Sequence, residues 1–155
     1  MKSIVTISQK EVNGIIDYIS HVINTQQWKP NIIVTMAKGG LIPARLLAKK
    51  LNINKILSFG ISFYNDNNQK VTTPIIYQNL TGCKDLLICS NILLVDDIAD
   101  TGDSLLYCMD HLASIGVDFH NIRTCSLYRK TGTRIIPDFY FNIVDDENWI
   151  VMPWE

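Results

Sequence analysis

The sequence alternates short apolar runs with amphipathic segments of helical periodicity, and this alternation constrains the fold more than any other feature. Apolar runs that fit buried strands lie at residues 31–36, 55–63, 91–95, 122–128 and 138–144. Helical segments lie at about residues 9–24, 41–51 and 104–115. Strands that alternate with helices favour a mostly parallel sheet covered on both faces. We therefore predict an α/β fold, in which residues 1–155 form a single domain with a mostly parallel central sheet flanked by helices.

The first helix carries the clearest local signal. Ser8 and Glu11 match a capping box, in which each side chain bonds the backbone N–H of the other residue. Apolar residues then recur at helical spacing: Val12, Ile15, Ile16, Ile19 and Val22. Gly116 is the natural stop of the helix that begins at Ser104. The polar segment 64–74 has no such pattern, and we predict an irregular, mobile loop there.

Composition argues against several functional classes. The chain has 47% hydrophobic residues, 19% charged residues and a net charge of −1, so it lacks the basic surplus typical of nucleic-acid binders. The longest apolar stretch, residues 86–95, is interrupted by Ser90 and Asn91 and is too short to span a bilayer. The first residues carry no apolar signal-peptide run, and the four cysteines form no C-x-x-C pair. We expect a cytoplasmic protein with reduced thiols, no nucleic-acid partner and no stable membrane insertion.

Polar residues and glycines follow two of the predicted strands, in turns at residues 36–43 and 96–104. Ligands of open α/β sheets bind at the carboxyl ends of strands. In the second turn, the N–H groups of residues 101–104 converge at a helix N-terminus, which suits a phosphate. The adjacent Asp96 and Asp97 suit the two cis hydroxyls of a ribose, because each hydroxyl donates a hydrogen bond to a carboxylate. This combination indicates a ribose 5-phosphate site; the alternative is that Asp97 and Asp100 only cap a helix and a solvated loop.

The second turn belongs to a longer motif. Residues 92–104, ILLVDDIADTGDS, resemble the motif with which type I phosphoribosyltransferases bind phosphoribosyl diphosphate (PRPP). Four further segments resemble parts of the bacterial xanthine-guanine and hypoxanthine branch of that family, in the same order along the chain. These are the pyrophosphate loop with its helix, the flexible catalytic loop, the segment of the purine-binding lysine and the C-terminal purine-binding segment, at residues 37–51, 61–69, 127–140 and 148–155. The resemblance implies the type I phosphoribosyltransferase fold, with a small hood from the C-terminal segment.

The activity implied by the resemblance is purine salvage. Such an enzyme transfers the 5-phosphoribosyl group of PRPP to a 6-oxopurine (guanine, xanthine or hypoxanthine), releases pyrophosphate and forms the nucleoside 5′-monophosphate. Mg²⁺ is the implied cofactor, PRPP and a purine base are the implied partners, and a homo-oligomer, either dimer or tetramer, is the expected assembly. Two alternatives stay open: a PRPP-sensing regulatory protein of the same fold, and a transferase for orotate or adenine.

The resemblance also implies roles for the residues at matching positions. The ribose hydroxyls and Mg²⁺ would be held by Asp96 and Asp97, and a second Mg²⁺ by Glu155. The 5-phosphate would be bound by Asp100, Thr101, Gly102, Asp103 and Ser104, and Asp100 would also be the catalytic group near purine N7. The pyrophosphate would be lined by Ala37, Lys38, Gly39 and Gly40. The purine would contact Lys130, Trp149 and Ile150, with Lys130 donating to the 6-oxo group and Trp149 stacking on the base. The flexible loop that closes over the site would carry Ser62 and Tyr64.

Two positions depart from the family pattern. Lys38 stands where an arginine is common, so a point charge replaces a bidentate fork. Asp103 places a negative charge in the phosphate loop, and we expect its side chain to point to solvent, with only its N–H facing the ligand. Without the resemblance, Trp149 would be interpreted as a core residue and Lys130 as a solvated charge at a strand end.

Overall fold

The computed structural model describes residues 3–155. Its main sheet consists of β2 (Ile32–Ala37), β3 (Ile56–Tyr64), β4 (Lys70–Gln78), β5 (Ile92–Ala99), β6 (Ile122–Lys130) and β7 (Asn142–Val144). The strand order is β4-β3-β2-β5-β6-β7, and neighbouring strands are parallel except for the antiparallel pair β3 and β4. The predicted α/β fold with a mostly parallel sheet is therefore confirmed.

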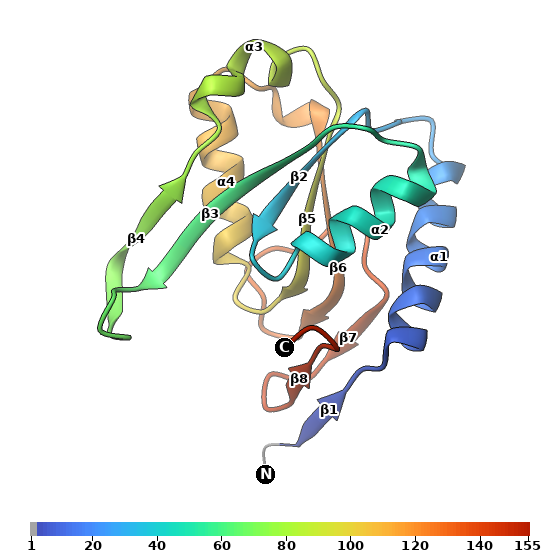
Figure 1. Cartoon of the computed structure of the whole chain (residues 1–155), viewed down its shortest axis with the longest axis vertical. Helices are drawn as coiled ribbons and strands as arrows, with labels where there is room; N and C mark the ends of the chain where they lie inside the picture. The colour runs from blue at the N-terminus through green and yellow to red at the C-terminus, as the bar shows by residue number, and fades with distance from the viewer. Residues whose placement is uncertain (1–2) are drawn as a thin grey trace.

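Helices cover both faces of this sheet (Figure 1). They are α1 (Gln9–Thr25), α2 (Leu41–Leu51), α3 (Lys84–Leu87) and α4 (Asp103–Ser114), with two short 3₁₀ segments, η1 (Thr81–Cys83) and η2 (Phe119–Asn121). The core between α1, α2 and the sheet is separate from the core between α3, α4 and the sheet. Among the helices of residues 3–155, none has the length and apolar character needed to cross a membrane.

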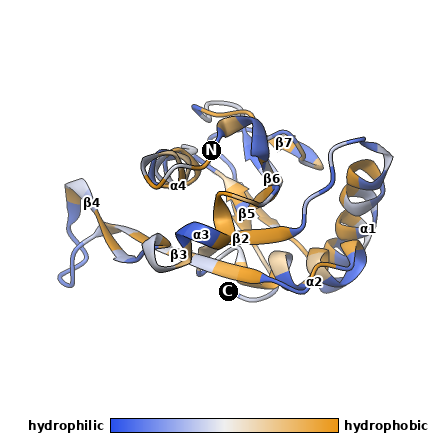
Figure 2. Ribbon diagram, turned by 90° about the horizontal axis from the view of Figure 1, so that it is seen from above, coloured by the Kyte–Doolittle hydropathy of each residue, from blue (hydrophilic) through white to orange (hydrophobic). Residues whose placement is uncertain are grey.

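The central strands β2 and β5 are buried on both faces, which explains their uninterrupted apolar sequences. Along β5, Leu93 and Val95 pack with α1 and α2, whereas Leu94 packs with α4. All three side chains are fully buried. Figure 2 shows the two strands in orange in the middle of the molecule, while the outer end of the arm formed by β3 and β4 is blue.

Helix α1 begins where the sequence predicts. Ser8 Oγ accepts a hydrogen bond from the N–H of Glu11 at 3.2 Å, and the Glu11 carboxylate accepts one from the N–H of Ser8 at 2.8 Å. The hydrogen bonds from Ser8 lower the pKa of Glu11. The apolar face is buried as predicted, through Val12, Ile15, Ile16 and Ile19. The capping box therefore sets the first turn of a helix whose packing is decided by its apolar face.

The prediction of an irregular loop at residues 64–74 is wrong for residues 70–74. Residues 70–74 belong to β4, which forms an antiparallel arm with β3 that projects from the body of the molecule (Figure 1). The turn of this arm is organised by Asn65, whose Oδ1 accepts the N–H groups of Asn67 at 3.0 Å and Gln69 at 2.9 Å. The β-branched residues of β4 outweigh its polar composition.

Other predicted elements differ at their ends. Strand β5 continues to Ala99 and does not end at residue 95, so Asp96 and Asp97 lie within the strand. Only the last part of the strand predicted at residues 138–144 forms, as β7. The residues before β7 are held to β6 by single contacts, such as the hydrogen bond from the N–H of Phe139 to the carbonyl of Thr124 at 3.0 Å.

The C-terminal segment forms a separate two-stranded sheet. Strand β8 (Trp149–Val151) pairs in parallel with β1 (Ile4–Thr6). The pairing is extended by hydrogen bonds from the N–H of Trp149 to the carbonyl of Ser3 at 2.8 Å and from the N–H of Ile7 to the carbonyl of Val151 at 2.9 Å. This sheet lies beyond the carboxyl ends of β5 and β6 (Figure 1) and forms the small hood predicted for the C-terminal segment.

Two substitutions in α1 should change stability in opposite directions. Ser8→Ala removes the capping acceptor and should lower the free energy of unfolding by about 1 kcal/mol. Gly14 is exposed in the same helix with nothing within 4 Å of an added Cβ. Gly14→Ala should therefore raise the free energy of unfolding by roughly 0.5–1 kcal/mol. Urea denaturation followed by circular dichroism measures both. A destabilising Gly14→Ala, or a neutral Ser8→Ala, would contradict this account of α1.

Candidate active site

Two carboxylates lie at the carboxyl end of β5. Asp96 and Asp97 are consecutive strand residues, so their side chains leave the strand on opposite faces. The N–H of Asp97 donates to Asp96 Oδ1 at 2.9 Å, and the N–H of Ile98 donates to Asp97 Oδ1 at 2.8 Å. Burial, reinforced by the charge of Asp97, raises the pKa of Asp96 well above its ordinary value. Asp96 is therefore the member of the pair that is biased toward its neutral form.

The turn after β2 packs directly against Asp97. A Cβ added to Gly39 would come within 2.6 Å of both carboxylate oxygens of Asp97. A Cβ added to Gly40 would lie 2.7 Å from the carbonyl oxygen of Val95 and 2.9 Å from that of Met36. Glycine is required at both positions because the backbone approaches β5 too closely for a side chain. The two turns singled out in the sequence thus meet at one place.

The same turn is also supported from the arm. The Tyr77 hydroxyl, from β4, donates a long hydrogen bond of 3.4 Å to the carbonyl of Ala37. The Tyr77 ring occupies the space that a side chain on Gly60 would fill. Lys38 follows Ala37 through a cis peptide bond, and its side chain is exposed. Tyr77 and Gly60 were not identified from the sequence; a glycine inside a predicted strand was the available signal.

The turn after β5 leads into α4. Gly102 has a φ of 82°, and the N–H of Asp103 donates to Thr101 Oγ1 at 3.2 Å. A Cβ on Gly102 would meet Ile135 Cγ2 at 2.6 Å and Thr133 Oγ1 at 2.8 Å, so both conformation and packing require glycine there. Because the first N–H groups of a helix lack partners within the helix, this turn is suited to an anion.

The expectation that Asp103 points to solvent is wrong. Its carboxylate forms an ion pair with Arg134, with Oδ1 and Nη1 2.5 Å apart, and its side chain is only 26% exposed. The partner lies 31 residues further along the chain, a separation at which no local pattern signals the contact. Arg134 is therefore a residue of this site that the sequence analysis missed.

A cavity of about 210 Å³ lies beside these turns. It is lined by residues from three separate parts of the chain: Asp97, Ile98, Asp100, Lys130, Trp149, Ile150 and Glu155. Every one of them except Ile98 was a predicted site residue. Trp149 is 62% exposed and thus not a core residue, which leaves its ring free to stack on a ligand.

Lys130 is buried at the end of β6, with 6% of the residue exposed. Its Nζ donates to the carbonyl oxygens of Asp146 at 3.3 Å, of Asp145 at 3.5 Å and of Asn148. An ammonium group has three donors, and each has a carbonyl within reach here. The structure therefore rules out the interpretation of Lys130 as a solvated charge at a strand end. Lys130 fixes the segment that brings Trp149 to the cavity.

The predicted residues of the closing loop do not join this cavity. Ser62 and Tyr64 lie in β3, on the arm, and Ser62 Oγ donates to the carbonyl of Tyr64 at 2.7 Å. Tyr64 is 55% exposed. The tip of the arm lies away from the hood in Figure 1, so the arm leaves the cavity open.

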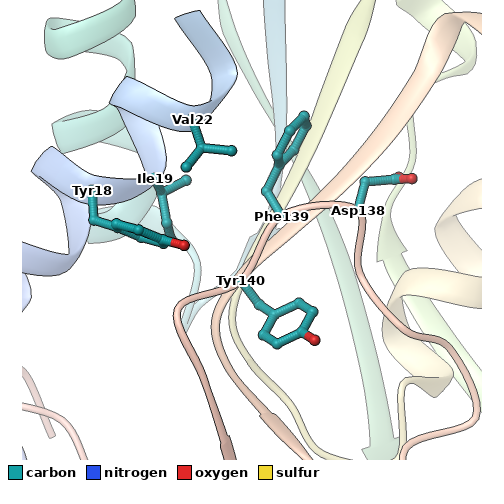
Figure 3. Close-up of a pocket in the computed structure, with 6 residues that line it drawn as sticks. All are labelled: Tyr18, Ile19, Val22, Asp138, Phe139 and Tyr140. Atoms are coloured by element: carbon teal, nitrogen blue, oxygen red, sulfur yellow. The ribbon is translucent and has the colours of Figure 1, made fainter. Parts of the chain in front are cut away.

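Another cavity, of about 160 Å³, lies between α1 and the segment that precedes β7 (Figure 3). Its lining residues are Tyr18, Ile19, Val22, Asp138, Phe139 and Tyr140. Figure 3 shows the Asp138 side chain directed away from Tyr18 and Ile19. Asp138 accepts hydrogen bonds from the N–H of Thr124 at 2.7 Å and from Thr124 Oγ1 at 3.0 Å, so its role is structural. The cavity beside Asp97 is the stronger candidate for chemistry.

Comparison with known protein families agrees with this geometry. Residues 2–155 match the model of the phosphoribosyl transferase domain. The chain belongs to this family. It is thus a phosphoribosyltransferase, an enzyme that transfers phosphoribose, and the family predicted from the sequence is confirmed.

Individual relatives support the same assignment. The phosphoribosyltransferase is 26% identical to a xanthine-guanine phosphoribosyltransferase of Idiomarina loihiensis over 124 aligned residues. The alignment covers 79% of this chain and 70% of that protein. The crystal structure of a purine phosphoribosyltransferase from Pyrococcus horikoshii covers 98% of this chain and 94% of its own, with a TM-score of 0.79 and 27% identity. A Neisseria gonorrhoeae protein with bound ppGpp covers 100% of this chain and 90% of its own, with a TM-score of 0.83; at 24% identity it shows the fold alone.

The carboxylates of the phosphoribosyltransferase suit a cation that is shared with a substrate. Within residues 3–155, no three His, Cys, Asp or Glu side chains are close enough to hold a metal by themselves. Mg²⁺ needs only one or two carboxylates where substrate phosphates and water complete its coordination. Asp97 and Glu155 line the same cavity, whereas Asp96 leaves the strand on the opposite face.

Gly40→Ala should damage the phosphoribosyltransferase at the junction of the two turns. The new Cβ would meet Thr35 Oγ1 at 2.5 Å and two backbone oxygens that are fixed in strands. We expect the free energy of unfolding to fall by roughly 1–3 kcal/mol, and activity to fall with it. Gly82→Ala is the matched control, because nothing lies within 4 Å of a Cβ there. Thermal unfolding compares the two variants, and equal midpoints would refute the close approach at Gly40.

Proposed function

We propose that the chain transfers the 5-phosphoribosyl group of PRPP to a 6-oxopurine (guanine, xanthine or hypoxanthine) and releases pyrophosphate. The position of Asp100 carries the proposal. Asp100 lines the cavity beside Trp149 and also a second cavity, of about 290 Å³, at the turn before α4. A nucleotide with its base against Trp149 and its 5-phosphate at that turn would place its ribose beside Asp97 and Asp100.

Asp96 and Asp97 bind the ribose in this proposal. Each cis hydroxyl of the sugar donates a hydrogen bond to a carboxylate. Asp96, Asp97 and Glu155 are the residues that would hold Mg²⁺. When bound, Mg²⁺ stabilises the charge that develops on the departing pyrophosphate.

The two turns bind the phosphate groups mainly through the backbone. The N–H groups of residues 101–104 take the 5-phosphate at the N-terminus of α4. The turn of Ala37, Lys38, Gly39 and Gly40 takes the pyrophosphate, with the exposed Lys38 supplying a point charge where a guanidinium would form a fork. The close contact between Gly39 and Asp97 keeps the leaving group next to the ribose carboxylates.

The base binds in the cavity between Lys130 and Trp149. Trp149 stacks on the ring, the backbone of Trp149 and Ile150 contacts its edge, and Lys130 donates to the 6-oxo group. Since the Lys130 ammonium already has three carbonyl acceptors, the 6-oxo group shares one of these donors. Adenine presents a 6-amino donor there, so two donors face each other and the 6-amino group gains no hydrogen bond from Lys130.

The reaction breaks the bond from C1 of the ribose to pyrophosphate and forms the bond from C1 to the purine nitrogen. An oxocarbenium-like transition state resembles that of glycoside cleavage. Asp100 faces N7, where it accepts the purine proton or stabilises positive charge as the new bond forms. Residues 62–69, which form the end of β3 and the turn of the arm, close over the site to exclude water, which would otherwise hydrolyse the activated sugar.

The cysteines and the exposed apolar side chains bear on the cellular location and the oligomeric state proposed for the enzyme. All four cysteines are free, which suits the reducing cytoplasm. A homo-oligomer is supported by apolar side chains that the arm exposes, namely Ile75, Ile76 and Tyr77.

A substrate panel tests the proposed function. The protein is incubated with PRPP, Mg²⁺ and one base at a time, and nucleotide formation is followed by absorbance. We expect turnover with at least one 6-oxopurine, and discrimination against adenine by roughly 5- to 150-fold, because the adenine 6-amino group is a donor that faces the Lys130 ammonium and gains no hydrogen bond from it. Turnover with orotate, or with adenine as the best base, would refute the assignment. Binding of PRPP without turnover of any base would indicate a regulatory protein.

Asp100→Asn tests the proton-transfer role. We expect kcat to fall by about 10²–10⁴-fold with little change in the KM for PRPP, since general acid–base catalysis contributes that much. Asp110→Asn, at an exposed position of α4, is the matched control and should keep wild-type kcat. Unchanged kcat in Asp100→Asn would remove Asp100 from the mechanism.

A further inference from the structure

The ion pair between Asp103 and Arg134 lies at the turn that takes the 5-phosphate in the proposed function. Asp103 Oδ1 and Arg134 Nη1 are 2.5 Å apart. Asp103 is largely covered, whereas the Arg134 side chain is 67% exposed. A phosphate group that carries nearly two negative charges must bind next to this carboxylate.

Arg134 is fixed against the turn by its own backbone. Its N–H donates to the carbonyl oxygen of Thr101 at 2.8 Å. Its neighbours Thr133 and Ile135 both fill the space that a Cβ on Gly102 would occupy. The guanidinium is therefore held beside Asp103 by a segment that is packed on the turn, and the pair is more than a chance contact of two surface side chains.

The local charge balance depends on Arg134. The cavity of about 290 Å³ at this turn is lined by Asp100, Thr101, Asp103, Gly132, Arg134 and Asp146. Three of these residues are acidic, and Arg134 alone is basic. Asp146 accepts the N–H of Gly132 at 2.8 Å. Without Arg134, Asp103 would add an uncompensated charge at the helix N-terminus that the phosphate approaches.

We propose that Arg134 is a positioning residue for PRPP: it neutralises Asp103 and turns that carboxylate aside, so that the N–H groups of the turn can donate hydrogen bonds to the 5-phosphate. The inference rests on the proposed function of this turn. Arg134 acts through Asp103 and does not contact the substrate. Loss of the guanidinium alone should repel PRPP, whereas loss of both charges should not.

A double-mutant cycle tests this dependence. The Kd for PRPP with Mg²⁺ is measured by calorimetry for the wild type, Arg134→Ala, Asp103→Asn and the double variant. We expect Arg134→Ala to raise the Kd roughly tenfold in the wild type, because it leaves a partly buried carboxylate unpaired. The same substitution made in Asp103→Asn should raise the Kd by less than about threefold. Lys70→Ala is the matched control, since Lys70 lines a neighbouring cavity with Asp103 and Arg134, and its Kd should stay within about twofold of wild type.

Two further readouts separate positioning from general damage. At saturating PRPP, Arg134→Ala should keep kcat within about twofold, because the residue does not contact the reacting atoms. Arg134→Lys keeps the charge and should recover most of the lost affinity.

Each contrary result has a distinct meaning. An equal loss of affinity from Arg134→Ala with and without Asp103→Asn would overturn the proposal in favour of direct phosphate contact. If the wild type binds PRPP and Arg134→Ala binds it with the same affinity, the positioning role of Arg134 is overturned and the proposed function is not. Failure of the wild type to bind PRPP would overturn the proposed function, and this inference with it.

Discussion

The parallel pairing of β2 with β5 is the constraint on which the rest of the site depends. The register joins Thr35 to Val95, and Thr35 Oγ1 donates to the Val95 carbonyl at 3.2 Å. Beyond this pair the two strands separate from each other: β2 ends at Ala37 and turns toward Gly39, whereas β5 continues through Asp97 beside β6. A slip by one residue would turn every side chain of β5 to the opposite face and separate Asp97 from the glycines of the first turn.

Burial of these strands offsets the cost of the charges at their ends. Leu93, Leu94 and Val95 are fully buried, and each such side chain contributes roughly 1.5–3 kcal/mol. The next residue, Asp96, is only partly covered, and its surroundings raise the pKa of its carboxyl. Since ΔG rises with pH only where the unfolded state binds more protons, the raised pKa of Asp96 makes this residue destabilising above its unfolded pKa. A stability cost of this kind is typical of functional sites.

The sequence predicts the parts of this molecule that depend on local pattern. The capping box at Ser8, the apolar run of β5 and the motif at residues 92–104 all rest on neighbouring residues. The structure shows the first two, and the family match supports the third. Strand β4 was missed because its faces are largely exposed and its composition is that of a loop. The ion pair of Asp103 with Arg134 and the three carbonyls around Lys130 were missed because they depend on how distant segments pack, which no periodicity reports.

A crystal structure of the protein with guanosine 5′-monophosphate tests the central claim most directly, because it locates the phosphate, the sugar and the base together. The account predicts the phosphate on the N–H groups of residues 101–104, the ribose hydroxyls at Asp96 and Asp97, and the base between Trp149 and Lys130. A nucleotide bound in the cavity between α1 and Tyr140, with the turn before α4 left free, would contradict it.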